Sequence, residues 1–257
     1  MGVLNVTPDS FSDGGRWLDP DAALRHGLAM VADGADVVDV GGESTRPGAE
    51  PVPVDEELRR VVPVIEALAP HVRVSIDTRT AAVAEAALSA GATLVNDVSA
   101  SLSAVAADGG AGWVAMHMQG DPRTMQQAPA YDDVVADVRR FLVERASAAR
   151  DAGVEEVWVD PGIGFGKTVD HNLALLRHLA DLVATGFPVV VGTSRKSFLG
   201  LLTASVHGRR AGPDDRLEAS VATAAWAIDQ GAAMVRVHDV GETVAAARLL
   251  AGTAGRA

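Results

Sequence analysis

One complete strand–helix–strand repeat decides the fold, and it reads VRVSIDTRTAAVAEAALSAGATLVNDV over residues 72–98. A short apolar run ends at Asp77, an Ala/Leu-rich segment of helical spacing follows over 80–90, and a second apolar run occupies Leu94–Val98. Gly91 follows the helical segment, where a glycine commonly ends a helix. The stretch therefore predicts a strand, a helix and a second strand.

The same alternation runs along the whole chain. Eight apolar runs predict strands: Met1–Val6, Asp36–Val40, Val72–Asp77, Leu94–Val98, Trp113–His117, Val157–Asp160, Val189–Gly192 and Met234–Val237. Segments of helical spacing lie between them, at roughly 20–33, 55–69, 80–90, 101–109, 132–152, 171–185, 197–204 with 216–230, and 242–251. Continuous apolar strands that alternate with helices are typical of a parallel sheet covered on both faces.

Eight strand–helix units in 257 residues predict the α/β class and a single (β/α)8 TIM barrel that occupies residues 1–257. A doubly wound open sheet is the alternative, although it usually has fewer strands. Because the first predicted strand starts at Met1, we expect the segment before it to be short or absent.

Composition excludes several classes of protein. The chain is 48% hydrophobic and 22% charged, as expected of a globular protein. It contains no cysteine, which excludes disulfides, iron–sulfur clusters, cysteine-ligated zinc and thiol catalysis. We see neither a membrane-spanning run nor a secretory signal, so we expect a cytoplasmic protein without a membrane partner.

The charged residues give two further indications. The net charge of −12 argues against nucleic acid as a partner, because the chain repels a phosphate backbone. Only two of the 22 basic residues are lysines, Lys167 and Lys196. Where arginine replaces lysine so freely, the two remaining lysines are candidates for a special role.

Polar side chains appear at the ends of the predicted strands. They are Asn5, Asp39, Asp77, Asn96 with Asp97, His117, Asp160, Ser194 to Lys196, and Arg236 with His238. Any one of them could simply end a strand or cap the next helix. All of them together would surround the C-terminal mouth of a barrel, where barrel enzymes have their active sites.

These strand ends exclude several kinds of site. The first strand ends at Asn5 without the His-x-His of a metal-dependent amidohydrolase, and an isolated His117 suits a hydrogen-bonded core histidine. Lys196 follows its strand, so a phosphate or carboxylate contact suits it better than a Schiff base. The segment GIGFGKT at 162–168 follows Pro161 where a P-loop needs glycine, and it also lacks the dinucleotide-binding pattern.

The remaining groups suggest two neighbouring subsites. The acceptors Asp77, Asn96 and Asp160 would lie deep, where a flat heterocycle with several N–H donors could satisfy them. A second set suits an anion of the phosphate or pyrophosphate type: Arg46, Arg236 and His238. Asn5 offers an oxygen to a hard cation such as Mg²⁺.

Motifs along the chain then become recognisable: NVTPDSFSDGG (5–15), DVGGESTRPGA (39–49), SIDT (75–78), NDVS (96–99), MHMQGDPRTMQ (116–126), DPGIGFGKT (160–168), GTSRKSFLG (192–200) and RVHDV (236–240). Their order and spacing resemble the dihydropteroate synthase family from residue 1 to about 250. Members of that family usually carry a short segment before the first strand, which we expect to be short or absent here.

The resemblance implies a homodimeric transferase of folate biosynthesis that binds Mg²⁺ and is a target of sulfonamides. Its substrates would be 6-hydroxymethyl-7,8-dihydropterin diphosphate and 4-aminobenzoate, and its products 7,8-dihydropteroate and pyrophosphate. By the same resemblance, the contact between subunits involves the seventh and eighth helices. The segments 7–17 and 41–53 would close over the site and exclude water.

The resemblance also assigns residues by position. For the pterin they are Asp39, Thr45, Asp77, Asn96, Met116, Asp160, Phe165, Gly192 and Lys196; for 4-aminobenzoate they are Phe11, Pro47, Ser194 and Arg195, with Thr45 and Phe165 nearby. Pyrophosphate would contact Arg46, Arg236 and His238, and Asn5 would bind Mg²⁺. The catalytic set would be Asn5, Arg46, Asp77, Lys196, Arg236 and His238.

Two alternatives remain open at this point. A pterin-dependent methyltransferase shares the barrel and the pterin acceptors, but it would not need Arg46 or the first loop. A non-catalytic pterin-binding paralogue would be expected to lose the pyrophosphate residues, and this chain has all of them.

Overall fold

A computed structural model describes residues 1–7, 20–44, 51–204 and 211–254 of the chain. Its strands are β1 Gly2–Asn5, β2 Val37–Gly41, β3 Arg73–Asp77, β4 Leu94–Asp97, β5 Gly112–Met116, β6 Val157–Asp160, β7 Val190–Val191 and β8 Met234–Val235. Its helices are α1 Pro20–Ala32, α2 Val54–Leu68, α3 Ala81–Ser89, α4 Ser103–Asp108, α5 Val134–Asp151, α6 Val169–Arg177, α7 Leu179–Val183, α8 Ser197–Leu202, α10 Leu217–Asp229 and α11 Val240–Ala254. All eight predicted strands are therefore confirmed.

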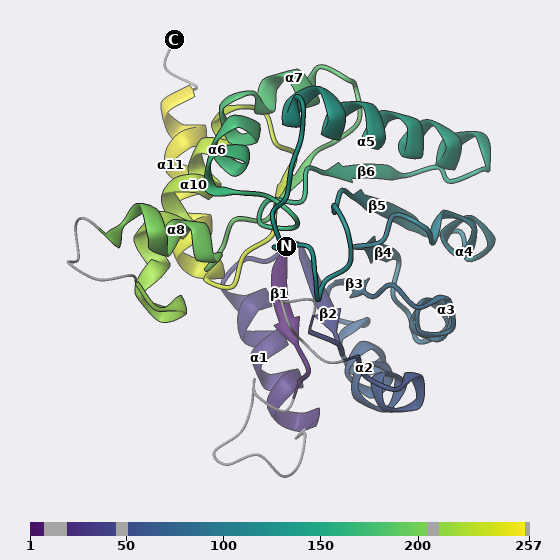
Figure 1. Cartoon of the computed structure of the whole chain (residues 1–257). Coiled ribbons are helices and arrows are strands. Elements are labelled where there is room, and N and C mark those ends of the chain that lie inside the picture. Colours follow the sequence, from purple (N-terminus) through teal and green to yellow (C-terminus); the bar gives the residue numbers. More distant parts are fainter. Residues whose placement is uncertain (8–19, 45–50, 205–210, 255–257) are drawn as a thin grey trace.

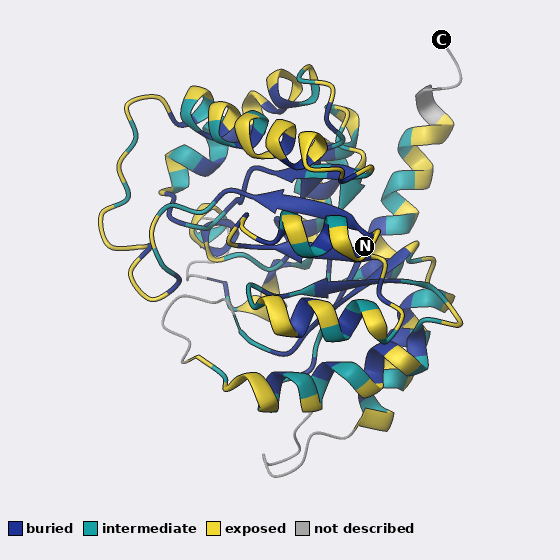
Figure 2. Cartoon of the chain, turned by 90° about the vertical axis from the view of Figure 1, so that its right-hand side faces the viewer, coloured by how far each residue is buried: buried dark blue, intermediate teal, exposed yellow. Residues whose placement is uncertain are grey.

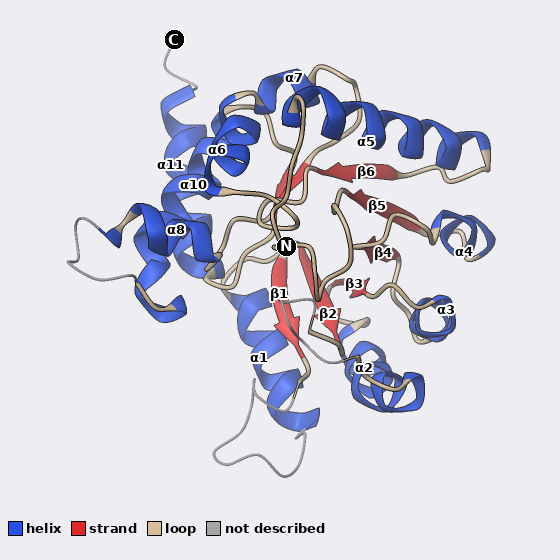
Figure 3. Ribbon diagram, in the orientation of Figure 1, coloured by secondary structure: helices blue, strands red, loops and turns tan. Residues whose placement is uncertain are grey.

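The strands close into a barrel with the helices outside (Figures 1 and 3). Strands β1 to β6 form a parallel sheet in chain order, and β7 pairs with β8. Backbone hydrogen bonds join the two sheets at both seams: Val3 N to Val237 O at 2.9 Å, and Val159 N to Pro188 O at 3.0 Å. This closure confirms the TIM barrel and excludes the open sheet.

The helices pack on the strands through one apolar face each. In α5, for example, Val138, Leu142 and Ala146 recur every four residues and are buried, while charged residues occupy the outer face. Asp133 caps this helix by accepting hydrogen bonds from the amides of Val135 and Ala136 at 3.0 and 3.1 Å. Figure 2 shows the same division, with exposed residues on the outer side of the helices and buried strands within.

An apolar layer fills the barrel interior beneath the mouth. It consists of Met1, Val37, Leu94, Val114 and Val190, packed against Trp158 and Met234. Because side chains alternate along a strand, the residues two positions further point into the same interior, nearer the C-terminal end. These next residues include Asp39 after Val37 and Asn96 after Leu94, so the sequence of each strand places a polar group above the apolar layer.

Two helical predictions needed correction. The segment 171–185 breaks at His178, whose φ of −105° and ψ of 25° end α6 and begin α7. The segment 216–230 is preceded by a 3-10 turn over Pro213–Arg216, and its α-helical part begins at Leu217. The helix-ending glycine predicted at Gly91 is confirmed by its φ of 109°, and glycines with positive φ also follow other helices, at Gly34, Gly153, Gly186 and Gly231. Within the described ranges, no helix is both long and apolar enough to cross a membrane.

Candidate active site

Arg236 is the centre of a polar cluster at the barrel mouth. Its Nε donates to Asp39 Oδ2 at 2.6 Å, and its Nη2 donates to Asp77 Oδ2 at 2.6 Å. Asn96 Nδ2 donates to the same oxygen of Asp39 at 2.9 Å. The barrel therefore brings together four predicted residues from β2, β3, β4 and the segment after β8.

The protonation of this cluster is set by burial and by its two carboxyl groups. Burial raises the pKa of Asp77 to about 7; Arg236 opposes this rise and Asp39 adds to it. Burial alone would lower the pKa of Arg236, but Asp39 and Asp77 hold that pKa above its usual value. Asp39 Oδ1 is buried and accepts no hydrogen bond from the described residues, so one acceptor of this cluster is left unsatisfied.

Asp160 and Lys196 form the second part of the mouth. Asp160 is buried at the end of β6 and accepts a hydrogen bond from Gly162 N at 2.7 Å. Burial raises the pKa of Asp160, and it lowers the pKa of Lys196 to about 8 against the attraction of Asp160. The ammonium of Lys196 donates to Ile163 O and lies 4.6 Å from the ring centroid of Phe165.

Asn5 lies at the same mouth, beside Gly41 of β2. A Cβ added at Gly41 would lie 3.7 Å from Asn5 Oδ1 and 3.5 Å from Asp77 Cβ, so Gly41 separates these two side chains. The described residues contain no group of three or more His, Cys, Asp or Glu side chains that could hold a metal. Asn5 Oδ1 is a neutral oxygen of the type that hard cations accept as a ligand.

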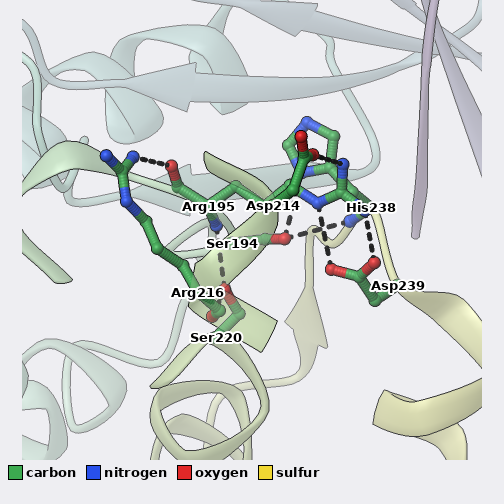
Figure 4. Close-up of polar contacts among 7 residues, drawn as sticks. All are labelled: Ser194, Arg195, Asp214, Arg216, Ser220, His238 and Asp239. Carbon is green, nitrogen blue, oxygen red and sulfur yellow. Dashed lines mark hydrogen bonds and ion pairs between the residues drawn. The ribbon is translucent and has the colours of Figure 1, made fainter. Parts of the chain in front are cut away.

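Ser194 and His238 connect the ends of β7 and β8 (Figure 4). Ser194 Oγ lies 3.0 Å from His238 Nδ1 and also accepts a hydrogen bond from His238 N at 3.1 Å. The guanidinium of Arg195 pairs with Asp239, at 2.5 Å from Nη2 and 3.1 Å from Nε, rather than with the carboxyl groups of the Arg236 cluster. The predicted residues Ser194, Arg195 and His238 therefore form one network.

Helix α10 and the turn before it fix the backbone of Arg195. Ser220 Oγ accepts a hydrogen bond from Arg195 N at 2.9 Å, and Arg216 Nη1 donates to Arg195 O at 2.7 Å. Arg195 has a φ of 58°, which is unfavourable for a side-chain-bearing residue and persists where neighbours determine the conformation. Sequence reasoning missed Arg216, Ser220 and Asp239, because only the tertiary fold brings them to this turn.

Two further predicted residues lie at the mouth, and four lie outside the described residues. Met116 pairs in register with Asp160, and a Cβ added at Gly192 would lie 3.7 Å from Arg236 Cβ and from Lys196 Nζ. The residues outside the described part of the chain are Phe11, Thr45, Arg46 and Pro47.

His117 and Lys167 form a buried pair in the connections that follow β5 and β6. His117 is 7% exposed, and its Nδ1 lies 2.9 Å from Lys167 Nζ, which confirms the prediction of a hydrogen-bonded core histidine. Lys167 is itself buried, so it does not serve as the phosphate-binding lysine of a P-loop. The scarcity of lysine was the sequence signal that marked Lys167 as unusual.

Comparison with known proteins gives consistent matches. A family model described as pterin binding enzyme matches residues 1–238. The dihydropteroate synthase of Mycobacterium leprae is 50% identical over 97% of this chain and 91% of the relative; that of Escherichia coli K12 is 47% identical over 98% and 90%.

Solved structures match over similar lengths. The dihydropteroate synthase of Yersinia pestis, in a sulfonamide drug complex, has a TM-score of 0.91 at 45% identity and covers 99% of this chain and 93% of its own. The enzyme of Xanthomonas albilineans with 4-aminobenzoic acid has a TM-score of 0.90 at 47% identity, covering 98% and 91%. The same species' enzyme with 7,8-dihydropteroate has a TM-score of 0.86 at 44% identity, covering 98% and 92%.

Proposed function

The chain belongs to the dihydropteroate synthase family of pterin binding enzymes, and from this membership we propose its reaction and its site. The enzyme condenses 6-hydroxymethyl-7,8-dihydropterin diphosphate with 4-aminobenzoate and releases 7,8-dihydropteroate and pyrophosphate. Relatives in complex with 4-aminobenzoic acid and with 7,8-dihydropteroate support this choice of substrate and product.

The observation that carries the proposal is the set of buried acceptors at the mouth. Asn96 and Asp160 are 7% and 3% exposed, and Asp77 of β3 pairs in register with Asn96 of β4. A dihydropterin ring presents several N–H donors in one plane, which these oxygens can accept. Such a ligand would satisfy groups that are otherwise costly to bury.

The reaction needs no protein nucleophile. The C–O bond between the pterin methylene and the diphosphate breaks, and the pyrophosphate leaves with the electron pair. The resulting positive charge is delocalised over the electron-rich ring, where Asp77 and Asp160 offset it. The amine nitrogen of 4-aminobenzoate then forms the C–N bond and loses a proton to solvent.

Cationic groups would stabilise the leaving pyrophosphate. Arg236 is held by two carboxyl groups, so its charge is in place before the reaction begins. We assign Arg46 and His238 to the same task from the family resemblance. A Mg²⁺ ion held by Asn5 and the diphosphate would neutralise part of the developing charge.

The proposed 4-aminobenzoate subsite lies beside Ser194 and Phe165. Phe165 contributes an aromatic wall that also contacts Lys196, and Ser194 contributes a hydroxyl held by His238. We assign Phe11, Thr45, Pro47 and Arg195 to this subsite from the resemblance.

The location of the protein in the cytoplasm stays a prediction.

A pyrophosphate-release assay tests the function. The purified protein is mixed with the pterin diphosphate and Mg²⁺, with and without 4-aminobenzoate, and 7,8-dihydropteroate is measured by mass spectrometry. We expect equimolar pyrophosphate and dihydropteroate that both depend on the amine. Release without the amine would indicate a hydrolase, and binding without release would indicate a non-catalytic paralogue.

A further inference from the structure

Lys167, the first of the two lysines in the chain, is surrounded by a cage of acceptor atoms that the proposed reaction does not use. Lys167 is 3% exposed, and its Nζ lies within hydrogen-bonding distance of four acceptor atoms. They are His117 Nδ1 at 2.9 Å, Gly162 O at 3.0 Å, Phe165 O at 3.0 Å and His117 O at 3.3 Å. A buried cation is costly unless all its donors are satisfied, so this complete set of partners indicates a structural role for Lys167.

The four acceptors stabilise the ammonium form of Lys167, whereas burial of the side chain favours the neutral amine. Burial, and then the neighbouring Lys167, lowers the pKa of His117 to about 3, so its ring is neutral and Nδ1 can accept. The three carbonyl oxygens can only accept, and an ammonium has three N–H groups to donate. Burial lowers the pKa of Lys167 to about 7, and the carboxylate of Asp160 opposes this shift.

The amine of Lys167 connects the loop that precedes it with the end of β5. Two of the acceptors, Gly162 O and Phe165 O, lie in the loop that leads to Lys167, and the other two belong to His117 just beyond β5. Gly162 has a φ of 63°, and a Cβ added there would lie 1.8 Å from His117 O. Only glycine allows this approach, so the cage depends on both the lysine and the glycine.

The other lysine rests on the same loop. Lys167 holds the carbonyls of Gly162 and Phe165. Lys196 contacts the carbonyl of Ile163, which lies between these two residues, and the ring of the same Phe165. We propose that Lys167 is a positioning residue: it fixes the loop so that Ile163 O and the Phe165 ring hold the Lys196 ammonium at the pterin subsite. The importance of Lys196 for turnover rests on the function proposed above.

Two substitutions test this role. Lys167→Met keeps the length but removes every donor, and Lys167→Arg keeps the charge but cannot direct three N–H groups at the same carbonyls. We expect kcat to fall about 10- to 100-fold, as when an outer residue that orients a catalytic group is lost. The KM values should change much less.

The pKa of Lys196 provides a readout that does not depend on the reaction. In both variants Lys196 is the single remaining lysine, so protein labelled with ¹⁵N-lysine gives one side-chain signal. We expect its pKa to rise from about 8 towards the value of about 10.4 of an exposed lysine. An unchanged pKa and kcat, or loss of the fold in both variants, would overturn the proposal.

Tyr131→Phe is the matched control. The Tyr131 hydroxyl donates to Gly166 O at 2.9 Å and so anchors the same loop at a residue that neither Ile163 O nor the Phe165 ring provides. We expect this variant to keep its kcat and its Lys196 pKa. An equal effect in Tyr131→Phe would show that any loosening of the loop suffices, and it would overturn a specific role for Lys167.

Chemical rescue at position 167 completes the test. It is possible because the chain has no cysteine of its own, so an introduced cysteine is the single thiol that is alkylated. Lys167→Cys is unfolded, alkylated with 2-bromoethylamine or with 2-bromoethanol, and refolded. The first adduct restores an amine at the lysine position, and the second places a hydroxyl there. We expect the amine alone to restore kcat, and equal activity of the two adducts would contradict the proposal. Wild-type protein that makes no dihydropteroate would refute the function and leave the Lys196 pKa experiment valid.

Discussion

Arg236, just beyond β8, donates a hydrogen bond of 2.6 Å to Asp39 in β2, across 197 positions of sequence. Closure of the barrel makes the contact, since the segment after β8 pairs with β1, which pairs with β2. The side chain of Asp39 is fully buried, while the side chain of Arg236 is 20% exposed. The buried carboxylate of Asp39 therefore depends on Arg236 to balance its charge, while the side chain of Arg236 also reaches the barrel mouth.

Arg236→Met should destabilise the protein strongly. It leaves the Asp39 carboxylate buried without its counter-charge, and such losses cost about 3–5 kcal/mol in the free energy of unfolding. Urea denaturation measures this cost. Arg236→Met with Asp39→Asn should regain part of it, because the stranded charge is gone. Additive losses in the double variant would show that the two side chains are not coupled.

Asp77→Asn should stabilise the protein increasingly as pH rises from 4 to 7. Burial raises the pKa of Asp77 to about 7 in the native state, against about 3.9 in the unfolded chain. Between these two values the native state keeps a proton that the unfolded chain has lost, so the contribution of Asp77 to wild-type stability falls as pH rises. Urea denaturation at pH 4, 6 and 8 should show a growing difference that levels off above pH 7. A constant difference would contradict the raised pKa. Turnover should fall in the same variant, because the charge that offsets the pterin cation is removed.

The sequence predicted which side chains reach the mouth but not how they pair. Asp39, Asn96 and Asp160 end apolar strands, and the two-residue period of a strand determines which face they share. Pairing depends on strand order and barrel closure, so nothing near Asp39 in the sequence indicates Arg236. The pattern of each strand therefore predicted correctly which of its side chains reach the mouth. The contacts between side chains of distant strands could be identified only once the fold was known.

Asp239→Asn should weaken binding of a sulfonamide or of 4-aminobenzoate. Asp239 pairs with Arg195 at 2.5 Å and is 16% exposed, so it holds the turn that also carries Ser194. Asp214→Asn is the matched control, since Asp214 is 92% exposed and lies 3.5 Å from the same guanidinium. Exposed ion pairs contribute about 0–1 kcal/mol, so this control should bind normally. Calorimetry measures both, and equal affinities in the two variants would contradict the role of Asp239.

The Arg195 network illustrates what sequence reasoning could not reach. Arg195 was expected at the 4-aminobenzoate subsite, and its neighbour Ser194 was also predicted. The positive φ of Arg195 and its contacts with Arg216 and Ser220 arise from the approach of α10 to the turn after β7. No local motif indicates that α10 contacts this turn, because α8 and a further connection separate the two in the sequence.

We predict a homodimer formed through α10 and α11. Trp226 on α10 is 47% exposed and Leu249 on α11 is 72% exposed, which suits a surface that a second copy covers. Light scattering at micromolar concentration should give twice the chain mass, and Leu249→Glu should shift it towards the monomer. Val54→Glu is the control, since Val54 is 40% exposed on α2. A wild-type monomer would refute the prediction.

Sulfonamides should bind in an ordered manner, after pyrophosphate and Mg²⁺. The pterin acceptors Asp77, Asn96 and Asp160 lie on β-strands, whereas the residues assigned to 4-aminobenzoate include Phe11 and Pro47, which lie outside the described residues. Closure of Gly-, Ser- and Pro-rich sequence over a ligand costs conformational entropy, and contacts of pyrophosphate with Arg46 and of Mg²⁺ with Asn5 would offset that cost.

A sulfonamide should therefore bind the free enzyme weakly and the pyrophosphate–Mg²⁺ complex more tightly. A coupling of about 1–3 kcal/mol is usual, and it must be reciprocal, so the drug should tighten pyrophosphate binding by the same factor. Phe11→Ala should reduce drug affinity more than pterin affinity, because the strands hold the pterin independently of these segments. Calorimetric titration with and without pyrophosphate decides the matter. Identical dissociation constants would mean that the pocket is preformed, since a ligand that changes no equilibrium cannot be coupled to closure.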